Sequence, residues 1–307
     1  MENRTLIPPY PMFGPGAEAF PDSPENPEGA ISVTWKDRPP TGMVDLKANI
    51  VYQSLDGEDQ LLQLFTPMSF MMMPGTPPPK YPLVVYVPGS AWHRQNPWMG
   101  IDKAQFFCSH GFALAIVAYR PTDIGATFPA QREDVKTAIN FLKQHAEEYG
   151  INAEKVALWG DSSGGHISVS VGADTPELVN CVIDWFGPTD ISQMNYYPSA
   201  MDHHGADSPE GLLIGGKNVI ENPELAQAVN PINKIFADKP FPPIMIMHGT
   251  KDNAVPFNQS VRLYERLTEC GKGVVFYRLE GGGHGSGGFL SDEAYRLVLE
   301  FVSKHIK

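Results

Sequence analysis

The feature that most constrains the fold of this chain is a serine that lies between glycines and joins two different kinds of segment. The motif is Gly160-Asp161-Ser162-Ser163-Gly164, which follows the apolar run 156–159 and precedes the small-residue stretch 165–172. This order predicts a strand, a sharp turn and a helix, with Ser162 at the tip of the turn. The flanking glycines are needed because a Cβ at either position would clash with the neighbouring strand or helix. We therefore expect Ser162 to be a nucleophile.

A serine in such a turn needs an acid and then a histidine later in the chain, each on a loop after a strand. The apolar run 243–247 leads into a loop that carries Asp252, and a strand expected at 274–279 leads into a glycine-rich loop that carries His284. His284 can take the proton of the serine hydroxyl and return it to a leaving group, because imidazole titrates near neutral pH. Asp252 would hold the imidazole in the required tautomer. The order serine, aspartate, histidine predicts a catalytic triad.

Other aspartates compete with Asp252 for the role of the acid. Asp190 follows the strand expected at 180–186, where a minority of serine hydrolases place this residue, and Asp184 lies within that strand. Asp252 is favoured because it precedes a Val-Pro turn and leads directly to the strand before the histidine. Asp161, inside the serine motif, is expected to form hydrogen bonds or to face the solvent, and not to join the triad.

The oxyanion that forms during acyl transfer needs two backbone N–H donors, one of them from the residue after the nucleophile. That residue is Ser163. The second donor comes from the loop after an earlier strand, which is expected at 83–87 and continues as Pro88-Gly89-Ser90-Ala91-Trp92-His93. Ser90 and Ala91 are therefore the candidates for the second donor.

These motifs resemble those of the α/β-hydrolase esterases, and more narrowly the bacterial acetyl-xylan-type and feruloyl-type carbohydrate esterases (BD-FAE-like). The matching segments are 88–92, 160–166, 185–190 and 248–256, and the resemblance covers about residues 45–305. It implies an α/β-hydrolase fold, an esterase activity and no cofactor. In one departure, the histidine and glycine run of the family's oxyanion loop are replaced here by Pro88, Ser90 and Ala91. Backbone donors need no particular side chain, so catalysis survives this change in principle.

The alternation of apolar and amphipathic segments predicts a mostly parallel, twisted sheet covered by helices on both faces. Strands are expected near 83–87, 113–119, 156–159, 180–186, 243–247 and 274–279, and helices near 102–110, 130–149, 164–172, 257–270 and 291–305. Segments 48–53 and 60–65 are expected to form an antiparallel hairpin around Asp56-Gly57. We expect one catalytic domain at 46–307, preceded by a proline-rich arm at 1–45.

The segment 191–230 is the least sheet-like part of the second half of the chain. We expect it to form a small cap insertion after the sixth strand, with short helices at 209–213 and 223–229, and to shape the substrate pocket. The alternative is a structural excursion without a role in binding. Its His203-His204 pair does not predict a metal site, because no third ligand lies at a suitable spacing. Trp92, His93 and Asp190 are the other residues expected to line the pocket.

Charge and cysteine content restrict the partners and the compartment. The formal net charge of −12 argues against nucleic acids and anionic membranes as partners, and no apolar run approaches the length of a membrane span. The chain starts without an apolar leader. It has an odd number of cysteines, Cys108, Cys181 and Cys270, so we expect free thiols in a reducing cytoplasm. A small acylated oligosaccharide or another small ester is then the expected substrate, and a homo-oligomer is compatible with the sequence.

The leading functional hypothesis is a serine carboxylesterase that acts through an acyl-enzyme on acetylated or aromatic-acylated carbohydrate. A general short-chain carboxylesterase or lipase-like enzyme is an alternative. A prolyl-oligopeptidase-like peptidase shares the motif and the triad order, but it would need a gating domain for which 307 residues leave no room. A non-catalytic binding protein of the same fold would typically lack the serine or the histidine, whereas Ser162 and His284 are both present.

Overall fold

The computed structural model describes residues 43–55, 57–68, 79–196 and 198–307. The expected N-terminal arm at 1–45 therefore lies outside the described residues up to position 42, and its last residues already enter the first strand, β1 (Val44–Leu55). Residue 56, in the expected hairpin turn, also lies outside the described residues.

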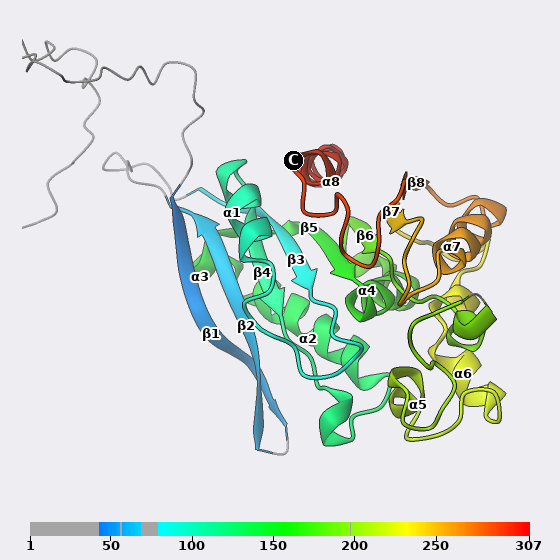
Figure 1. The fold of residues 1–307 in the computed structure, drawn as a ribbon. Helices are drawn as coiled ribbons and strands as arrows, with labels where there is room; N and C mark the ends of the chain where they lie inside the picture. The colour runs from blue at the N-terminus through cyan, green and yellow to red at the C-terminus, as the bar shows by residue number, and fades with distance from the viewer. Residues whose placement is uncertain (1–42, 56, 69–78, 197) are drawn as a thin grey trace, which may run out of the picture.

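A single eight-stranded sheet runs through the described part of the chain in the order β1-β2-β4-β3-β5-β6-β7-β8 (Figure 1). The strands after β1 are β2 (Glu58–Pro67), β3 (Tyr81–Val87), β4 (Ala113–Val117), β5 (Ile151–Asp161), β6 (Cys181–Trp185), β7 (Ile244–Gly249) and β8 (Val274–Leu279). The six neighbouring strands β4, β3, β5, β6, β7 and β8 pair in parallel. Strand β2 pairs antiparallel with both β1 and β4. The mostly parallel sheet and the N-terminal hairpin are both as predicted.

Helices cover both faces of the sheet, because the strands are apolar on both sides. The longer helices are α1 (Ile101–Ser109), α2 (Ala130–Gln144), α4 (Ser163–Asp174), α7 (Asn258–Glu269) and α8 (Asp292–Ile306). Buried side chains of α1 and α8 form one apolar core with the sheet, and those of α2, α4 and α7 form the other. The three cysteines are buried and unpaired. None of the helices in the described ranges is long and apolar enough to cross a membrane.

The helix expected at 130–149 is interrupted at His145. The ring Nδ1 of His145 lies 2.9 Å from the carbonyl oxygen of Phe141, so the side chain caps the end of α2. The short helix α3 (Ala146–Tyr149) then continues to Gly150, whose φ of 64° ends it in the left-handed conformation.

The segment between β6 and β7 contains only short helices: η4 (Ile191–Tyr196), α5 (Pro209–Leu213), α6 (Pro223–Val229) and η5 (Pro231–Lys234). The bounds of α5 and α6 agree with the sequence prediction. Ser208 begins α5 by accepting a hydrogen bond from the Gly211 N–H, and proline follows it at the first helical position. In Figure 1 this segment lies beyond the ends of the strands, on the side of α2 and α4.

Candidate active site

Ser162 occupies a sharp turn between the end of β5 and the start of α4. Its backbone has φ 52° and ψ −125°, a conformation that costs free energy for a residue with a side chain. A Cβ on Gly160 would collide with the carbonyl of Gly164, and a Cβ on Gly164 would collide with the carbonyl of Val87. The two glycines therefore permit the turn that presents Ser162, which is the reason given for them from the sequence.

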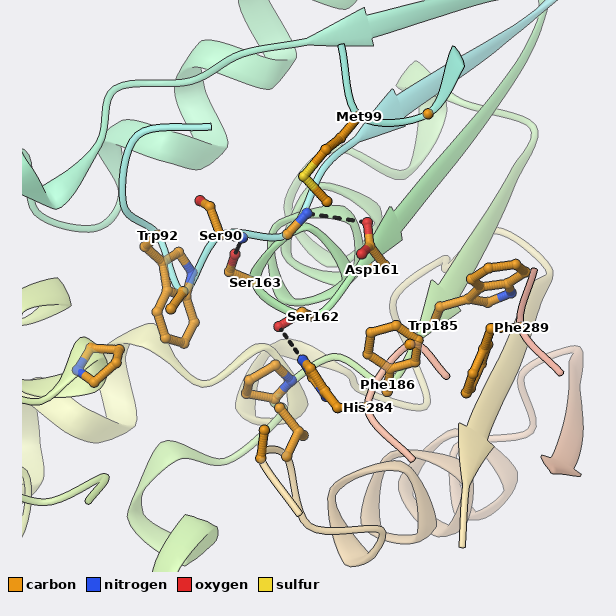
Figure 2. Close-up of a pocket in the computed structure, with 18 of the residues that line it drawn as sticks. Ser90, Trp92, Met99, Asp161, Ser162, Ser163, Trp185, Phe186, His284 and Phe289 are labelled. Carbon is orange, nitrogen blue, oxygen red and sulfur yellow. Dashed lines mark hydrogen bonds between the residues drawn. The ribbon is translucent and has the colours of Figure 1, made fainter. Parts of the chain in front are cut away.

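The structure brings together the three residues expected to form the triad. The Nε2 atom of His284 lies 3.1 Å from the Oγ atom of Ser162, and its Nδ1 atom lies 2.8 Å from the Oδ2 atom of Asp252. Figure 2 shows the imidazole facing the serine hydroxyl. With the proton on Nδ1, the ring donates to Asp252 and leaves Nε2 free to accept the proton of Ser162.

Asp252 is held in its ionised form by a dense set of hydrogen bonds. Its Oδ1 atom accepts from the backbone N–H groups of Ala254 and Val255, both at 2.9 Å. Burial raises the pKa of Asp252, but hydrogen bonds and charge from His248 and His284 outweigh it and hold the pKa well below the usual range. Asp252 is therefore a carboxylate wherever His284 can act as a base.

His248 is a second partner of the acid that the sequence did not identify as a site residue. It is fully buried at the end of β7, with its Nε2 atom 3.3 Å from Oδ2 of Asp252 and 3.0 Å from the carbonyl oxygen of Val255. Its Nδ1 atom lies 2.7 Å from the hydroxyl of Ser260, at the start of α7. His248 thus ties the loop that carries Asp252 to β7 and α7.

The competing aspartates lie elsewhere and have other partners. Asp190 pairs with Arg262 at 2.8 Å and accepts a 2.9 Å hydrogen bond from Asn230. Asp184 is fully buried in β6 beneath the serine turn, where its Oδ1 atom accepts from the N–H of Gly187. Neither carboxyl contacts His284, so the geometry favours Asp252 as the acid.

The buried Asp184 leads to a prediction about stability. Burial raises the pKa of Asp184 to about 7, well above the ordinary value of an aspartate. The unfolded chain therefore ionises at lower pH than the folded protein, and stability falls as the pH rises from about 4 to about 7. We expect Asp184→Asn to abolish about 3 kcal/mol of the stability loss between about pH 5 and about pH 8. Denaturant unfolding at the two pH values measures this, and an unchanged difference would contradict a buried neutral Asp184.

The predicted oxyanion donors are only partly supported by the backbone geometry. Ser163 is the first residue of α4, so its N–H has no partner within the helix. The N–H of Ser90 donates a 2.9 Å hydrogen bond to Oγ of Ser163, which makes it unsuitable as the second donor. The N–H of Ala91 has no acceptor among the described residues. Of the two candidates for the second oxyanion donor, Ser90 and Ala91, only Ala91 therefore remains.

A cluster of hydroxyl groups supports the oxyanion loop at the place where the sequence departs from the family pattern. Besides accepting from Ser90, Oγ of Ser163 lies 3.1 Å from the hydroxyl of Tyr119, which in turn lies 3.0 Å from Oγ of Ser90. Ala91 and Trp92 follow with φ values of 54° and 59°, the left-handed region that glycine adopts most readily. The serine hydroxyls thus hold a strained loop that a glycine run would form without strain.

Loss of the Ser163 hydroxyl should weaken this loop. Ser163→Ala leaves the Ser90 N–H without its acceptor, so we expect a loss of about 1–3 kcal/mol in the free energy of unfolding. We also expect kcat for ester hydrolysis to fall about tenfold, because the loop that positions Ala91 loses its anchor. Ser168→Ala is the matched control, since the Ser168 hydroxyl on the same helix has no partner among the described residues. Equal effects of the two variants would show that the cluster does not support the loop.

Asp161 connects the serine turn to the oxyanion loop. Its Oδ1 atom accepts a 2.6 Å hydrogen bond from the hydroxyl of Tyr86 and a 3.1 Å hydrogen bond from the N–H of Gly89. Of the two roles expected for Asp161, hydrogen bonding and a solvent-facing position, these contacts agree with the first.

Ser162 and His284 open into a cavity of about 760 Å³. Trp92 lines it as expected and lies across from Trp185 and Phe289 in Figure 2. The apolar side chains that line the cavity and are also exposed at the surface are Trp98, Met99, Ile101, Met201 and Leu290. The site is therefore an apolar pocket with an apolar rim.

Two residues expected in the pocket lie outside it. His93 closes a tight turn by donating its N–H to the carbonyl of Ser90, and its ring pairs with Asp123 at 2.9 Å on the surface. Asp190 belongs to a separate polar depression, because Arg262 and Asn230 hold it away from the cavity. Neither residue lines the cavity, so this part of the prediction is wrong.

Polar residues that line the cavity were missed from the sequence. Lys103 of α1 is buried, and its ammonium lies 4.8 Å from the ring centre of Tyr86, with three further aromatic rings within 5.8 Å. His203 and Glu210, from the segment after β6, also line it. From the sequence, the His203-His204 pair was considered only as a possible metal site. Among the described residues, no three His, Cys, Asp or Glu side chains lie close enough together to hold a metal ion.

Comparison with known proteins agrees with the motifs and the fold. A family model described as BD-FAE matches residues 71–267, which is more than half of the chain. The chain belongs to the BD-FAE family. The resemblance indicated by the sequence motifs is thereby confirmed.

Several relatives of this chain are described as esterases. A truncated carbohydrate esterase from gut microbiota superimposes with a TM-score of 0.74 at 28% identity, covering 86% of this chain and 96% of that one, which confirms the α/β-hydrolase fold. The esterase LipC of Mycobacterium tuberculosis is 26% identical over 219 residues, or 66% of this chain and 53% of that protein. An acetylxylan esterase of Xylanibacter ruminicola is 23% identical over 206 residues, or 66% and 41%. The chain spans about half the length of the curated relatives it matches.

Proposed function

We propose that this protein is a serine esterase that hydrolyses carboxylic esters through an acyl-enzyme on Ser162. The observation that carries the proposal is the continuous hydrogen-bonded chain from the buried Asp252 side chain through His284 to the strained Ser162, which opens into an apolar cavity. Membership of the BD-FAE family and the esterase relatives support the same activity.

The proposed mechanism gives each of these groups a role in the reaction. Nε2 of His284 takes the proton of Ser162 as the hydroxyl oxygen attacks the ester carbonyl. The N–H groups of Ser163 and Ala91 stabilise the oxyanion, and Asp252 stabilises the imidazolium. His284 then protonates the leaving alcohol, and a water molecule activated by the same imidazole hydrolyses the acyl-enzyme and restores Ser162.

The substrate that we propose is a carbohydrate that carries an acetyl or feruloyl group. The gut carbohydrate esterase and the acetylxylan esterase support an acylated sugar. Aromatic side chains in the cavity wall, such as Trp92 and Phe289, suit either an aromatic acyl group or the apolar face of a sugar ring. The segment 191–230 contributes Met194, Met201 and His203 to the cavity, which supports its role as a cap that shapes the pocket.

A general short-chain carboxylesterase is the second candidate function. The apolar rim of the cavity favours it, because such a rim accepts alkyl or aryl alcohols without polar recognition. We propose that the protein is located in the cytoplasm, and the buried, unpaired cysteines support this location.

A matched set of esters tests the proposed function. The set consists of 4-nitrophenyl acetate, butyrate and octanoate, methyl ferulate and acetylated xylo-oligosaccharide, each measured with the wild type and with Ser162→Ala. We expect the highest kcat/KM on the acetylated sugar or on the ferulate, and no measurable turnover by the variant. A preference for the octanoate would favour the general carboxylesterase, and absence of turnover on the whole set would contradict the esterase proposal.

A further inference from the structure

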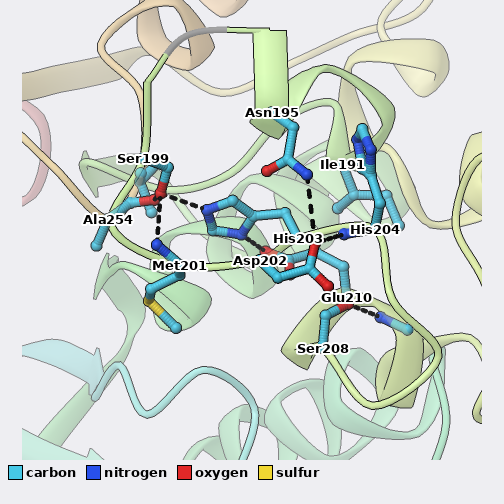
Figure 3. A network of polar contacts seen from close by, with 12 residues as sticks. Ile191, Asn195, Ser199, Met201, Asp202, His203, His204, Ser208, Glu210 and Ala254 are labelled. Carbon is cyan, nitrogen blue, oxygen red and sulfur yellow. Dashed lines mark hydrogen bonds and ion pairs between the residues drawn. The ribbon is translucent and has the colours of Figure 1, made fainter.

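The wall of the catalytic cavity contains a buried histidine–carboxylate pair outside the triad. His203 and Glu210 line the cavity, and each is only 2% exposed. The Nδ1 atom of His203 lies 2.9 Å from Oε1 of Glu210, and its Nε2 atom lies 2.8 Å from Oγ of Ser199 (Figure 3). Both ring nitrogens are therefore occupied, and the imidazole fixes the orientation of the carboxylate.

The second carboxylate oxygen of Glu210 is left without a partner. Oε2 is buried and has no hydrogen bond to any described residue. A buried acceptor without a donor costs free energy, and that cost is relieved when a donor becomes available. Glu210 lines the cavity that contains Ser162. A small rotation of its carboxylate that exposes Oε2 would let a hydroxyl group of a bound substrate supply that donor.

Other carboxyl groups that line the cavity already have protein donors. Asp161 accepts from Tyr86 and from the backbone of Gly89, and Asp102 accepts from the hydroxyl of Tyr295. Glu210 differs from both because its second oxygen is buried without a partner, whereas no oxygen of Asp161 or Asp102 is buried in that state. Met201 and Pro209 are among its apolar neighbours in the cavity lining.

We propose that Glu210, oriented by His203, accepts hydrogen bonds from hydroxyl groups of the substrate and so selects esters of sugars and similar polyhydroxylated alcohols. A carboxylate is an acceptor only and pairs well with O–H donors, while apolar walls suit the C–H faces of a sugar ring. A few well-placed polar groups in an apolar pocket determine which ligand fits. This inference rests on the proposed esterase function and assigns Glu210 a role in specificity, not in the chemical step.

The test compares two esters of the acid that the wild type prefers in the set above: its ethyl ester and a monoacylated xylobiose. Glu210→Gln preserves the size and the acceptor for His203, but it replaces the uncommitted acceptor with an NH₂ donor. We expect kcat/KM for the sugar ester to fall about 10- to 100-fold, and that for the ethyl ester to change by less than about threefold. Glu224→Gln is the matched control, because it makes the same change on an exposed position of α6 and should affect neither ester.

Each other outcome overturns the inference. Equal losses on both esters would show that Glu210 only supports the shape of the pocket, and an unchanged sugar ester would show that it does not contact the substrate. If Glu210→Gln does not fold, His203→Gln provides the test. This variant removes the imidazole that orients the carboxylate, so kcat/KM should again fall for the sugar ester and not for the ethyl ester. A wild type that hydrolyses both esters equally contradicts this inference alone, whereas one that hydrolyses neither contradicts the esterase proposal as well.

Discussion

Ser162→Ala is expected to lower kcat/KM for 4-nitrophenyl acetate by about 10⁴- to 10⁶-fold, because the variant has no nucleophile to form the acyl-enzyme. The fold should be preserved. Alanine retains the Cβ of serine, so it adds no strain at φ 52°, and the side chain lies at the tip of a turn and not in a core cluster. Steady-state kinetics, together with thermal unfolding of both proteins, measure the effect.

Ser199→Ala is the control for this prediction, because Ser199 contacts a histidine that is itself paired with a carboxylate. Ser199 does not line the cavity and has no positive φ, so it lacks both the access and the turn geometry of Ser162. Its loss should leave hydrolysis of 4-nitrophenyl acetate within about threefold of the wild type, since this substrate has no hydroxyl groups. Near-normal turnover by Ser162→Ala, or loss of turnover in Ser199→Ala alone, would contradict the assignment of the nucleophile.

Asp252→Asn is expected to lower kcat by about 10⁴-fold with little change in the fold. An amide in place of the carboxylate favours the wrong tautomer of His284 and removes the charge that stabilises the imidazolium. Since the pKa of Asp252 lies well below the usual range, the acid limb of the wild-type pH–rate profile does not report its protonation.

Asp190→Asn is the matched comparison for the acid. It makes the same chemical change at the competing position, where the carboxyl pairs with Arg262 and does not contact His284. We expect kcat to stay within about threefold of the wild type, while stability falls by about 1 kcal/mol through the weakened ion pair. If Asp190→Asn lost more activity than Asp252→Asn, the acid would have to be reassigned to Asp190.

The sequence was most informative where a single residue type is required by local geometry. Glycine at 160 and 164 and the order of Ser162, Asp252 and His284 predicted the turn and the triad, because each residue follows a strand that pairs in parallel with its neighbour. Parallel strands end at the same edge of a sheet, so the loops after them meet. The geometry of the three residues follows from that topology.

The oxyanion loop could be located from the sequence, but its donors could not be resolved. Whether Ser90 or Ala91 presents a free N–H depends on a hydrogen bond to the side chain of Ser163, about 70 positions away in the chain. A pattern of residue types does not encode which of two adjacent N–H groups is used by such a contact.

The pocket residues were the hardest to predict, because they come from segments without periodic structure. Glu210 belongs to a helix of five residues and pairs with a histidine from the preceding irregular stretch. His93 and Asp190 were expected in the cavity only because they lie close in sequence to the active loops. Turns and ion pairs, with Asp123 and Arg262 respectively, direct both side chains elsewhere.

The measurement that tests the central claim most directly is the identification of the covalent intermediate. The protein is mixed with 4-nitrophenyl acetate, quenched in acid during turnover and digested, and the acetylated peptide is sequenced by mass spectrometry. We predict acetyl transfer to Ser162, accompanied by a burst of 4-nitrophenol close to one equivalent per active site if deacylation is the slower step, and no acetylated peptide from Ser162→Ala. Acetylation of another residue, Ser199 included, with Ser162 unmodified would contradict the account.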